Sequence, residues 1–141
     1  MAIQEGAQLP AATMHTMQEG KPTPVTTDDL FANKKVVVFA VPGAFTPTCS
    51  MAHLPGYVVH SDAIKAKGVD SIVCLSVNDA FVMGAWGDNA NAEELLMVGD
   101  GNGDFTQALG LEMDGSGFGL GKRSQRYAMI VDNGTVTKLA V

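Results

Sequence analysis

One of the two cysteines of this sequence stands where a thiol can become a nucleophile. Cys49 ends the segment 42–49 (PGAFTPTC), which directly follows an apolar, β-branched stretch and leads into a predicted helix. Pro47 suits the first turn of a helix, so Cys49 is expected in or near that turn. Unpaired backbone N–H groups and the helix dipole favour an anion there. Such a position can lower the pKa of a thiol to about 3.5–7.5 and so produce a thiolate.

The alternative is that Cys49 is a small buried hydrophobe, as most free cysteines are. The junction between a strand and a helix favours chemistry, because open α/β sheets carry their sites at the carboxyl ends of parallel strands. Thr46 lies three residues earlier, close enough on a turn for its hydroxyl to face the sulfur. Cys74 lies inside the apolar segment 71–75 (SIVCL) and is predicted to be inert core.

Other segments resemble binding motifs without completing them. Residues 100–111 open like a calcium loop, but Phe105 and Leu111 stand where that loop needs glycine and glutamate. The glycines of 115–121 precede Lys122, yet Arg123 stands where a phosphate-binding loop has serine or threonine. The three histidines lack enough neighbouring ligands for a metal site. The sequence therefore predicts neither a metal nor a bound cofactor.

Hydrophobic patterning predicts the elements that would position Cys49. Two strands buried on both faces, at 35–41 and 68–77, flank a helix that Pro55 should kink or restart, so these strands should run parallel. Asn-Gly at 133–134 predicts an antiparallel hairpin. The other expected elements are a strand near 13–17, a helix from Thr26 or Thr27 towards Phe31, a helix capped by Asn78 or Asp79 through Trp86, a strand at 95–98, a helix from an Asp104 cap to Gly110, and strands at 127–131 and 135–139. The expected architecture is an α/β fold with a mixed central sheet and helices on both faces.

Length and composition fit one globular domain over residues 1–141. The apolar fraction of 46% supplies a core, and 17% charged residues is too few for a disordered chain. A net charge of −6 disfavours nucleic acid as a partner. The longest apolar run, 36–41, is far shorter than the ~20 residues of a membrane span. With only two cysteines and no signal-peptide pattern, we expect a cytoplasmic protein.

Three blocks of the sequence, in order, resemble one family. Pro42, Thr46 and Cys49 match the Pro-x-x-x-Thr-x-x-Cys signature of peroxiredoxins. Their flanks, together with 74–82 (CLSVNDAFV) and 123–127 (RSQRY), resemble the subgroup of plant type II and mammalian type-five enzymes. The resemblance covers essentially the whole chain and implies a thioredoxin-like fold.

The resemblance also implies an activity and a role for each matching residue. Cys49 would be the peroxidatic cysteine, Thr46 the hydroxyl that contacts it and the peroxide, Pro42 a shield of the thiolate, and Arg126 the arginine that reaches the site. The reaction would reduce hydrogen peroxide or alkyl hydroperoxides and leave a sulfenic acid on Cys49, with glutathione and glutaredoxin, or thioredoxin, as reductant. Arg123 is interpreted as a solvated charge at a strand end.

Two departures from the family pattern leave alternatives open. The sequence has no cysteine near its carboxyl terminus and no final helix, which relatives usually carry. It is therefore either a one-cysteine enzyme, which we favour, or a shortened chain that lost a resolving cysteine. A thiol–disulfide oxidoreductase is disfavoured because Thr46 stands where Cys-x-x-Cys needs its first cysteine.

Aromatic residues suggest a partner surface. Phe45, Phe81 and Phe118 belong to predicted loops or element ends on the side of the sheet that carries the site. Exposed together, they predict a homodimer, as in the resembled subgroup, and packing over their own loops is the alternative. Together with Trp86 they also support a second function class, a non-enzymatic interaction or holdase domain.

Overall fold

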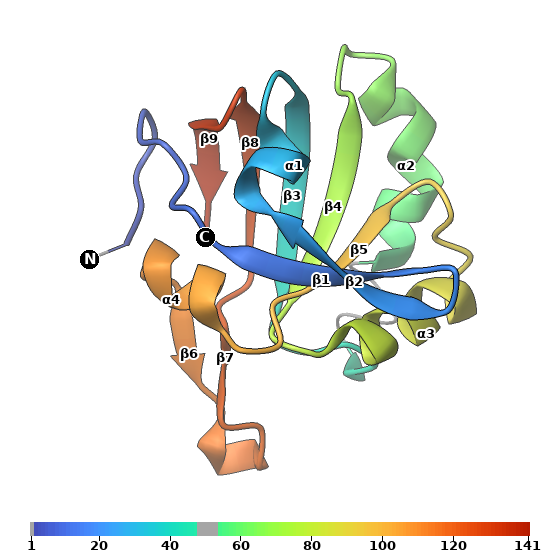
Figure 1. Cartoon of the computed structure of the whole chain (residues 1–141), viewed down its shortest axis with the longest axis vertical. Coiled ribbons are helices and arrows are strands. Elements are labelled where there is room, and N and C mark those ends of the chain that lie inside the picture. The colour runs from blue at the N-terminus through green and yellow to red at the C-terminus, as the bar shows by residue number, and fades with distance from the viewer. Residues whose placement is uncertain (1, 48–53) are drawn as a thin grey trace.

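A mixed sheet forms the centre of the protein in the computed structural model, which describes residues 2–47 and 54–141 (Figure 1). Seven strands run in the order β2-β1-β5-β4-β3-β8-β9. A separate pair, β6 and β7, forms a hairpin at one end of the molecule. The strands are β1 (Thr13–Gln18), β2 (Lys21–Thr26), β3 (Lys35–Val41), β4 (Ser71–Ser76), β5 (Leu96–Gly99), β6 (Glu112–Asp114), β7 (Lys122–Ser124), β8 (Tyr127–Asp132) and β9 (Thr135–Ala140).

The strand that leads to Cys49 lies between two partners. β3 pairs in parallel with β4 and antiparallel with β8, which confirms the predicted parallel pair. Its β-branched and aromatic side chains suit a strand buried on both faces. The β8–β9 hairpin is confirmed as well: Asn133 and Gly134 have φ values of 48° and 79°, which such a two-residue turn requires.

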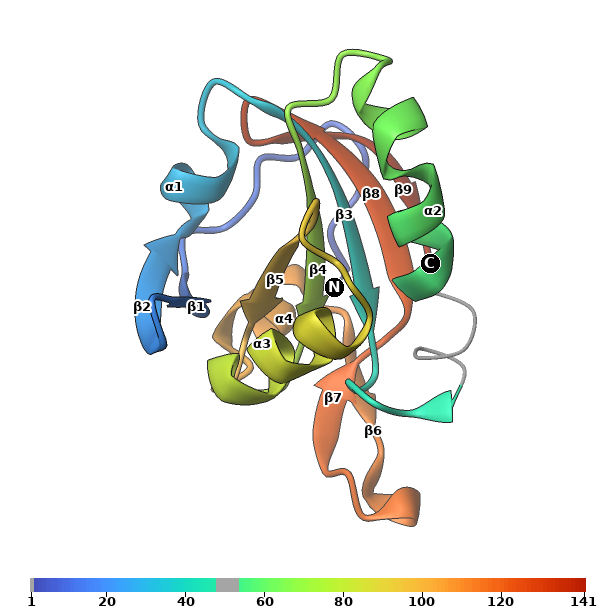
Figure 2. The ribbon, with the colours of Figure 1, turned by 90° about the vertical axis from the view of Figure 1, so that its right-hand side faces the viewer.

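Helices cover both faces of the sheet (Figure 2). On one face α1 (Thr27–Phe31) and α4 (Asp104–Leu109) pack with Val36 and Val38 of β3. On the other, α2 (Leu54–Lys65) and α3 (Ala80–Asn89) pack with Phe39 and Val41. Successive β3 side chains therefore enter opposite cores, as strand geometry demands, and the predicted α/β architecture is confirmed. No helix in the described part of the chain is long and apolar enough to cross a membrane.

The helix starts follow local hydrogen bonding. Thr26 caps α1 in a capping box with Asp29, and Asp79, not Asn78, caps α3. Pro55 lies in α2, whose described part begins at Leu54. The kink expected at Pro55 involves residues 48–53, which lie outside the described residues.

The start of α4 differs from the prediction. Asp104 is the first helical residue, and the preceding Gly103 has no side chain to act as a cap. The buried carboxylate of Asp100 instead accepts hydrogen bonds from the backbone N–H groups of Phe105 (3.2 Å) and Thr106 (2.8 Å). A carboxylate buried at the end of β5 needs such donors, and the helix N-terminus supplies them.

The structure contains two hairpins, β1–β2 and β6–β7, that the sequence analysis did not predict. The predicted strand near 13–17 is β1, but its partner β2 was not expected because Pro22 and Pro24 interrupt it. β2 is the outer strand of the sheet, where a proline that donates no ladder hydrogen bond is tolerated. The β6–β7 hairpin carries the short helix η2 (Ser116–Phe118) at its tip and projects from the body of the protein (Figures 1 and 2).

A buried phenol lies at the start of β8. The hydroxyl of Tyr127 has no hydrogen-bond partner among the described residues. Burial, and to a smaller extent the Asp100 carboxylate, raises the pKa of Tyr127 well above its usual value. The folded protein therefore holds the neutral phenol.

Tyr127→Phe should raise the free energy of unfolding by about 1 kcal/mol at neutral pH, because it removes a buried polar group that lacks a partner. Since the folded-state pKa is raised, the stability linked to the Tyr127 proton is fully present below the unfolded pKa of about 10 and is lost as pH rises above it. The variant should therefore lose less stability above about pH 10 than the parent. Urea unfolding at neutral and alkaline pH measures both effects, and equal alkaline losses would contradict the assignment.

Candidate active site

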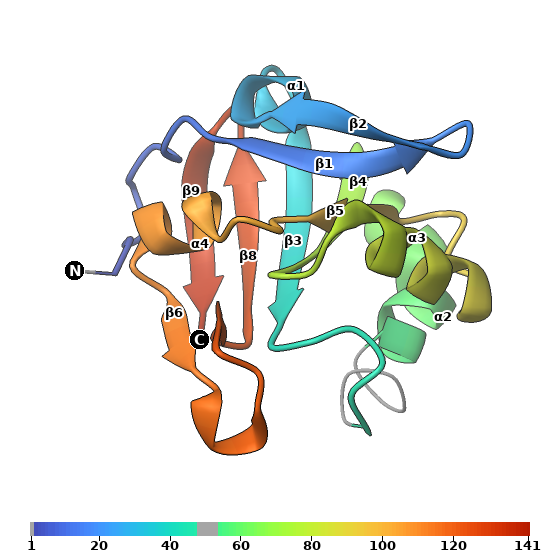
Figure 3. The ribbon, with the colours of Figure 1, turned by 60° about the horizontal axis from the view of Figure 1, so that its bottom comes forward.

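The predicted site begins where β3 ends. The segment 42–47, here called the 42–47 loop, leaves the carboxyl end of β3 (Figure 3). β4 and β5 run parallel to β3, so Ser76 and Gly99 end their strands at the same edge of the sheet. The loop thus occupies the edge where open α/β sheets carry their sites. Pro47 already has helical backbone, as expected for a proline in a first helical turn.

Hydrogen bonds fix the backbone of the 42–47 loop. The hydroxyl of Thr46 donates to the carbonyl oxygen of Gly43 at 2.8 Å. The backbone N–H of Ala44 donates to Oδ1 of Asn78 at 3.0 Å, and the hydroxyl of Ser76 donates to the same oxygen at 2.7 Å. Because the Thr46 proton is engaged by Gly43, the Thr46 oxygen offers its lone pairs to any further group.

The loop also holds a residue in an unfavourable backbone conformation. Phe45 has a φ of 63°, in the left-handed region that costs a non-glycine residue roughly 1–2 kcal/mol. Its ring lies 6.4 Å from the ring of Trp86, centroid to centroid, at a tilt of 49°. Trp86 is buried in the core between α3 and the sheet. It therefore anchors the loop from within and is not available for the partner surface considered from the sequence.

Arg126 reaches the same edge from the other side of β3. Tyr127 of β8 pairs with Ala40 of β3, so Arg126 lies one residue further, level with Val41. β8 runs antiparallel to β3, so its first residues lie beside the last residues of β3. The fold therefore brings half-buried Arg126 to the end of the strand from which Pro42 and Thr46 follow. Arg126 lies 84 positions after Pro42 in the chain, so sequence spacing alone cannot relate these residues.

Arg123 is not the solvated charge that the sequence suggested. Its side chain is half-buried, and Nη1 donates to the carbonyl oxygen of Pro42 at 3.1 Å. Nε donates to the carbonyl oxygen of Leu120 at 3.1 Å. The reason is the β6–β7 pairing, which places β7 beside the 42–47 loop, and this pairing was absent from the sequence analysis.

The structure describes only one of the two cysteines, Cys74. Cys49 lies outside the described residues, so its predicted place in or near a first helical turn stays a prediction. Cys74 is fully buried in β4, where it packs in the core beneath α2 and α3. This location agrees with its interpretation as core.

Sequence reasoning missed two residues that hold the loop. Asn78 and Ser76 belong to the block 74–82 that resembles the family, but neither was assigned a role towards the loop, yet they form the bonds that fix Ala44. The available signal was their position directly after a buried strand that is parallel to β3. Polar residues at that point lie at the same sheet edge as the loop.

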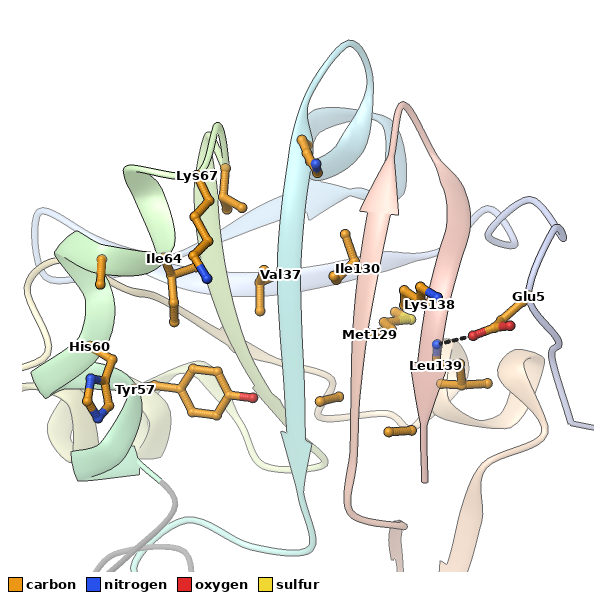
Figure 4. A pocket seen from close by; sticks show the side chains of 15 residues that line it. Glu5, Val37, Tyr57, His60, Ile64, Lys67, Met129, Ile130, Lys138 and Leu139 are labelled. Carbon is orange, nitrogen blue, oxygen red and sulfur yellow. Dashed lines mark hydrogen bonds between the residues drawn. The ribbon is translucent and has the colours of Figure 1, made fainter.

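A groove of about 740 Å³ opens between α2 and the sheet strands β3, β8 and β9 (Figure 4). Apolar side chains line most of it, including Val37, Ile64 and Ile130, and Tyr57 points into it from α2. None of its described lining residues belongs to the 42–47 loop. Among the residues that the structure describes, no group of three or more histidine, cysteine or acidic side chains could hold a metal ion.

Comparisons with known proteins agree with this geometry. The Redoxin family model matches residues 4–141. The hybrid peroxiredoxin hyPrx5 of Haemophilus influenzae is 47% identical over 141 residues, which are 100% of this chain and 58% of that protein. The chain spans about three-fifths of the length of the first curated relatives it matches.

Solved structures match over a larger share of their length. Reduced Prx3 of Vibrio vulnificus in complex with H2O2 is 62% identical, with a TM-score of 0.95 over 99% of this chain and 87% of that one. The Plasmodium falciparum antioxidant protein, a 1-Cys peroxiredoxin, is 32% identical, with a TM-score of 0.91 over 97% of this chain and 83% of that one. The thioredoxin-like fold predicted from the sequence is thereby confirmed. The chain belongs to the Redoxin family and, within it, to the peroxiredoxins.

Proposed function

We propose that this protein is a thiol-dependent peroxidase that reduces hydrogen peroxide and alkyl hydroperoxides through Cys49. The observation that carries the proposal is the fixed 42–47 loop, which presents the Thr46 oxygen at the sheet edge where Arg126 directly precedes β8. The 62% identity to a Prx3 whose structure contains H2O2 supports the same substrate class.

The proposed reaction transfers one oxygen atom to sulfur. The thiolate of Cys49 attacks one oxygen of the peroxide, an S–O bond forms and the O–O bond breaks. Sulfur loses two electrons and takes the attacked oxygen with its hydrogen, which gives the sulfenic acid. The other oxygen accepts those electrons and leaves as an alkoxide or hydroxide, which takes a proton to give an alcohol or water.

Thr46, Arg126 and Pro42 would each serve one need of this reaction. The Thr46 oxygen, with its own proton held by Gly43, accepts the O–H of a hydroperoxide and so orients the O–O bond. The guanidinium of Arg126 donates to the oxygen that gains negative charge as the O–O bond breaks. Pro42, with no N–H and a rigid ring, shields the thiolate from water.

We further propose a one-cysteine cycle. Cys74 is buried in β4 and cannot meet an external thiol, so the sulfenic acid of Cys49 would condense with one reductant thiol and release water. A second thiol would then free Cys49 and leave as the disulfide. Glutathione with glutaredoxin, or thioredoxin, is the proposed reductant, and a cytoplasmic location fits a sequence that keeps only two cysteines.

A direct assay tests the function. The protein with glutathione and glutaredoxin, or with a thioredoxin system, should consume hydrogen peroxide in proportion to protein concentration. Mass spectrometry of protein treated with one equivalent of peroxide, then trapped with dimedone, should find the adduct on the peptide that contains Cys49. A protein that consumes no peroxide with either system and yields no adduct would refute the proposed peroxidase function and favour the alternative, a non-enzymatic interaction or holdase domain.

We propose that the protein forms a homodimer through the end that carries the 42–47 loop. Three aromatic side chains of that end are exposed: Phe118 by 89%, Phe81 by 60% and Phe45 by 50%. They belong to η2 at the hairpin tip, to the start of α3 and to the loop, which all lie towards one end of the molecule (Figures 1 and 2). A two-fold interface would bury such a patch against its own copy.

Light scattering on a size-exclusion column should therefore report twice the chain mass of 14.7 kDa. Phe118→Glu should shift the protein towards monomer, because it puts a charge at the centre of an apolar contact. Val59→Glu on α2, at an apolar residue that is 75% exposed, is the matched control and should leave the dimer intact. A parent protein that stays monomeric at high concentration would refute the proposal.

A further inference from the structure

Arg123 connects the projecting hairpin to the backbone from which the reacting segment starts. Its guanidinium bonds the carbonyl oxygen of Leu120 within the hairpin and that of Pro42 across 81 residues of sequence. A guanidinium holds its donors in one rigid plane, so two simultaneous bonds fix both partners relative to each other. A lysine ammonium on a flexible stem does not reproduce that geometry.

The close approach of Arg123 depends on Gly43. A Cβ atom added at Gly43 would lie 2.9 Å from Nη1 of Arg123 and 3.1 Å from Cγ2 of Thr46. The guanidinium therefore occupies space that any larger residue at 43 would need. Gly43 is buried, and the guanidinium and the Thr46 methyl group both lie on the side of Gly43 to which a Cβ atom would project.

Three consecutive residues of the loop are held by three different side chains. Arg123 bonds the oxygen of Pro42, Thr46 bonds the oxygen of Gly43, and Asn78 bonds the N–H of Ala44. The Thr46 hydroxyl finds its acceptor only where the peptide between Gly43 and Ala44 is correctly oriented. Asn78 holds the N–H of that peptide, and Arg123 holds the carbonyl of the peptide just before it. The strained φ of Phe45 persists only while these contacts hold the loop.

We infer that Arg123 is a positioning residue for the reaction at the 42–47 loop. It fixes the peptide between Pro42 and Gly43 and thereby the orientation of the next peptide, whose Gly43 carbonyl accepts the hydrogen bond of the Thr46 hydroxyl. The inference rests on the proposed function for its effect on rate, but not for its effect on the loop. Arg123 is assigned no contact with the peroxide, which distinguishes its role from that proposed for Arg126.

Amide hydrogen exchange tests the clamp without reference to activity. In Arg123→Ala the amide of Ala44 should exchange at least about tenfold faster than in the parent, because the loop opens more often. Lys122→Ala is the matched control, since Lys122 is an exposed cation on the same strand, and it should leave that exchange unchanged. Unchanged exchange at Ala44 in Arg123→Ala would overturn the inference, even in an active enzyme.

Kinetics then connect the clamp to the reaction. Trp86 is the one tryptophan of the sequence and touches Phe45 of the loop, so its fluorescence can follow the peroxide reaction in a stopped-flow instrument. Arg123→Ala and Arg123→Lys should each lower the second-order rate constant by about tenfold, whereas Lys122→Ala should not. If the parent consumes no peroxide, the proposed function fails, and the exchange measurement alone decides the inference.

A double-mutant cycle separates positioning from a general loss of stability. If Arg123 acts through Thr46, then Arg123→Ala should lower the rate far less in a Thr46→Val background than in the parent. Additive effects, or a loss of rate that follows only the loss of folded protein in thermal unfolding, would overturn the inference. Gly43→Ala offers a second variant should Arg123→Ala fold poorly. It keeps the arginine in the sequence, but the added methyl group would push the guanidinium away from the loop. It should show the same faster exchange at Ala44.

Discussion

Cys49→Ser should reduce peroxide consumption to the rate of the solution without protein. A serine hydroxyl stays protonated at neutral pH, and none of the described residues of the 42–47 loop offers a general base to activate it. The loss should therefore be complete, and not the partial loss expected from a residue that only orients the substrate. Initial rates of peroxide loss with each reductant system measure it.

Cys74→Ser is the matched control for the nucleophile. It removes the other thiol, which is fully buried in β4, and should leave most of the activity. The cost should appear in stability, at about 1–3 kcal/mol, because a hydroxyl replaces sulfur in an apolar core. Retained activity in Cys49→Ser, or a dead Cys74→Ser that still folds, would reverse the assignment of the two cysteines.

Thr46→Val and Arg126→Gln should each lower the second-order rate constant with peroxide by at least about tenfold. A single preorganised donor aimed at developing charge is commonly worth ~2.7–4 kcal/mol of transition-state stabilisation, so the loss in Arg126→Gln can be larger. Valine keeps the shape of threonine and removes the oxygen that accepts the hydrogen bond of the peroxide O–H, so the O–O bond is no longer oriented. Glutamine is a shorter, neutral side chain that can still donate a hydrogen bond, so the variant removes the positive charge of the arginine.

Thr46→Val should also affect the loop. It removes the bond to the Gly43 carbonyl, so it should speed amide exchange at Ala44. For Arg126→Gln the prediction concerns the rate, because the proposed role of Arg126 is towards the peroxide. Stopped-flow rates and hydrogen exchange on the same samples separate these effects. A rate equal to that of the parent in either variant would remove that residue from the proposed mechanism.

Local chemistry made much of this protein predictable from its sequence. The apolar β-branched run of β3, the capping threonine and aspartates of α1, and the Asn-Gly turn between β8 and β9 each form by short-range rules. The position of the 42–47 loop after a buried strand follows from the same rules, as does the burial of Cys74 within an apolar strand. For these features, neighbours in sequence are also the neighbours that decide the conformation.

Features that depend on distant partners were decided by the tertiary structure. β2 forms despite Pro22 and Pro24 because it is an outer strand, and no local signal says which strand will be outermost.

The locations of Arg123 and Arg126 also depend on partners that are distant in the sequence. The antiparallel pairing of β8 with β3 brings Arg126 to the sheet edge that carries the loop, a location that the sequence suggested only through a family resemblance. Arg123 reads as a solvated charge in the sequence because its partner, the carbonyl of Pro42, is 81 residues away. A charged side chain gains a defined position only when the folded backbone supplies acceptors for it, and those acceptors exist only after the hairpin and the sheet have come together.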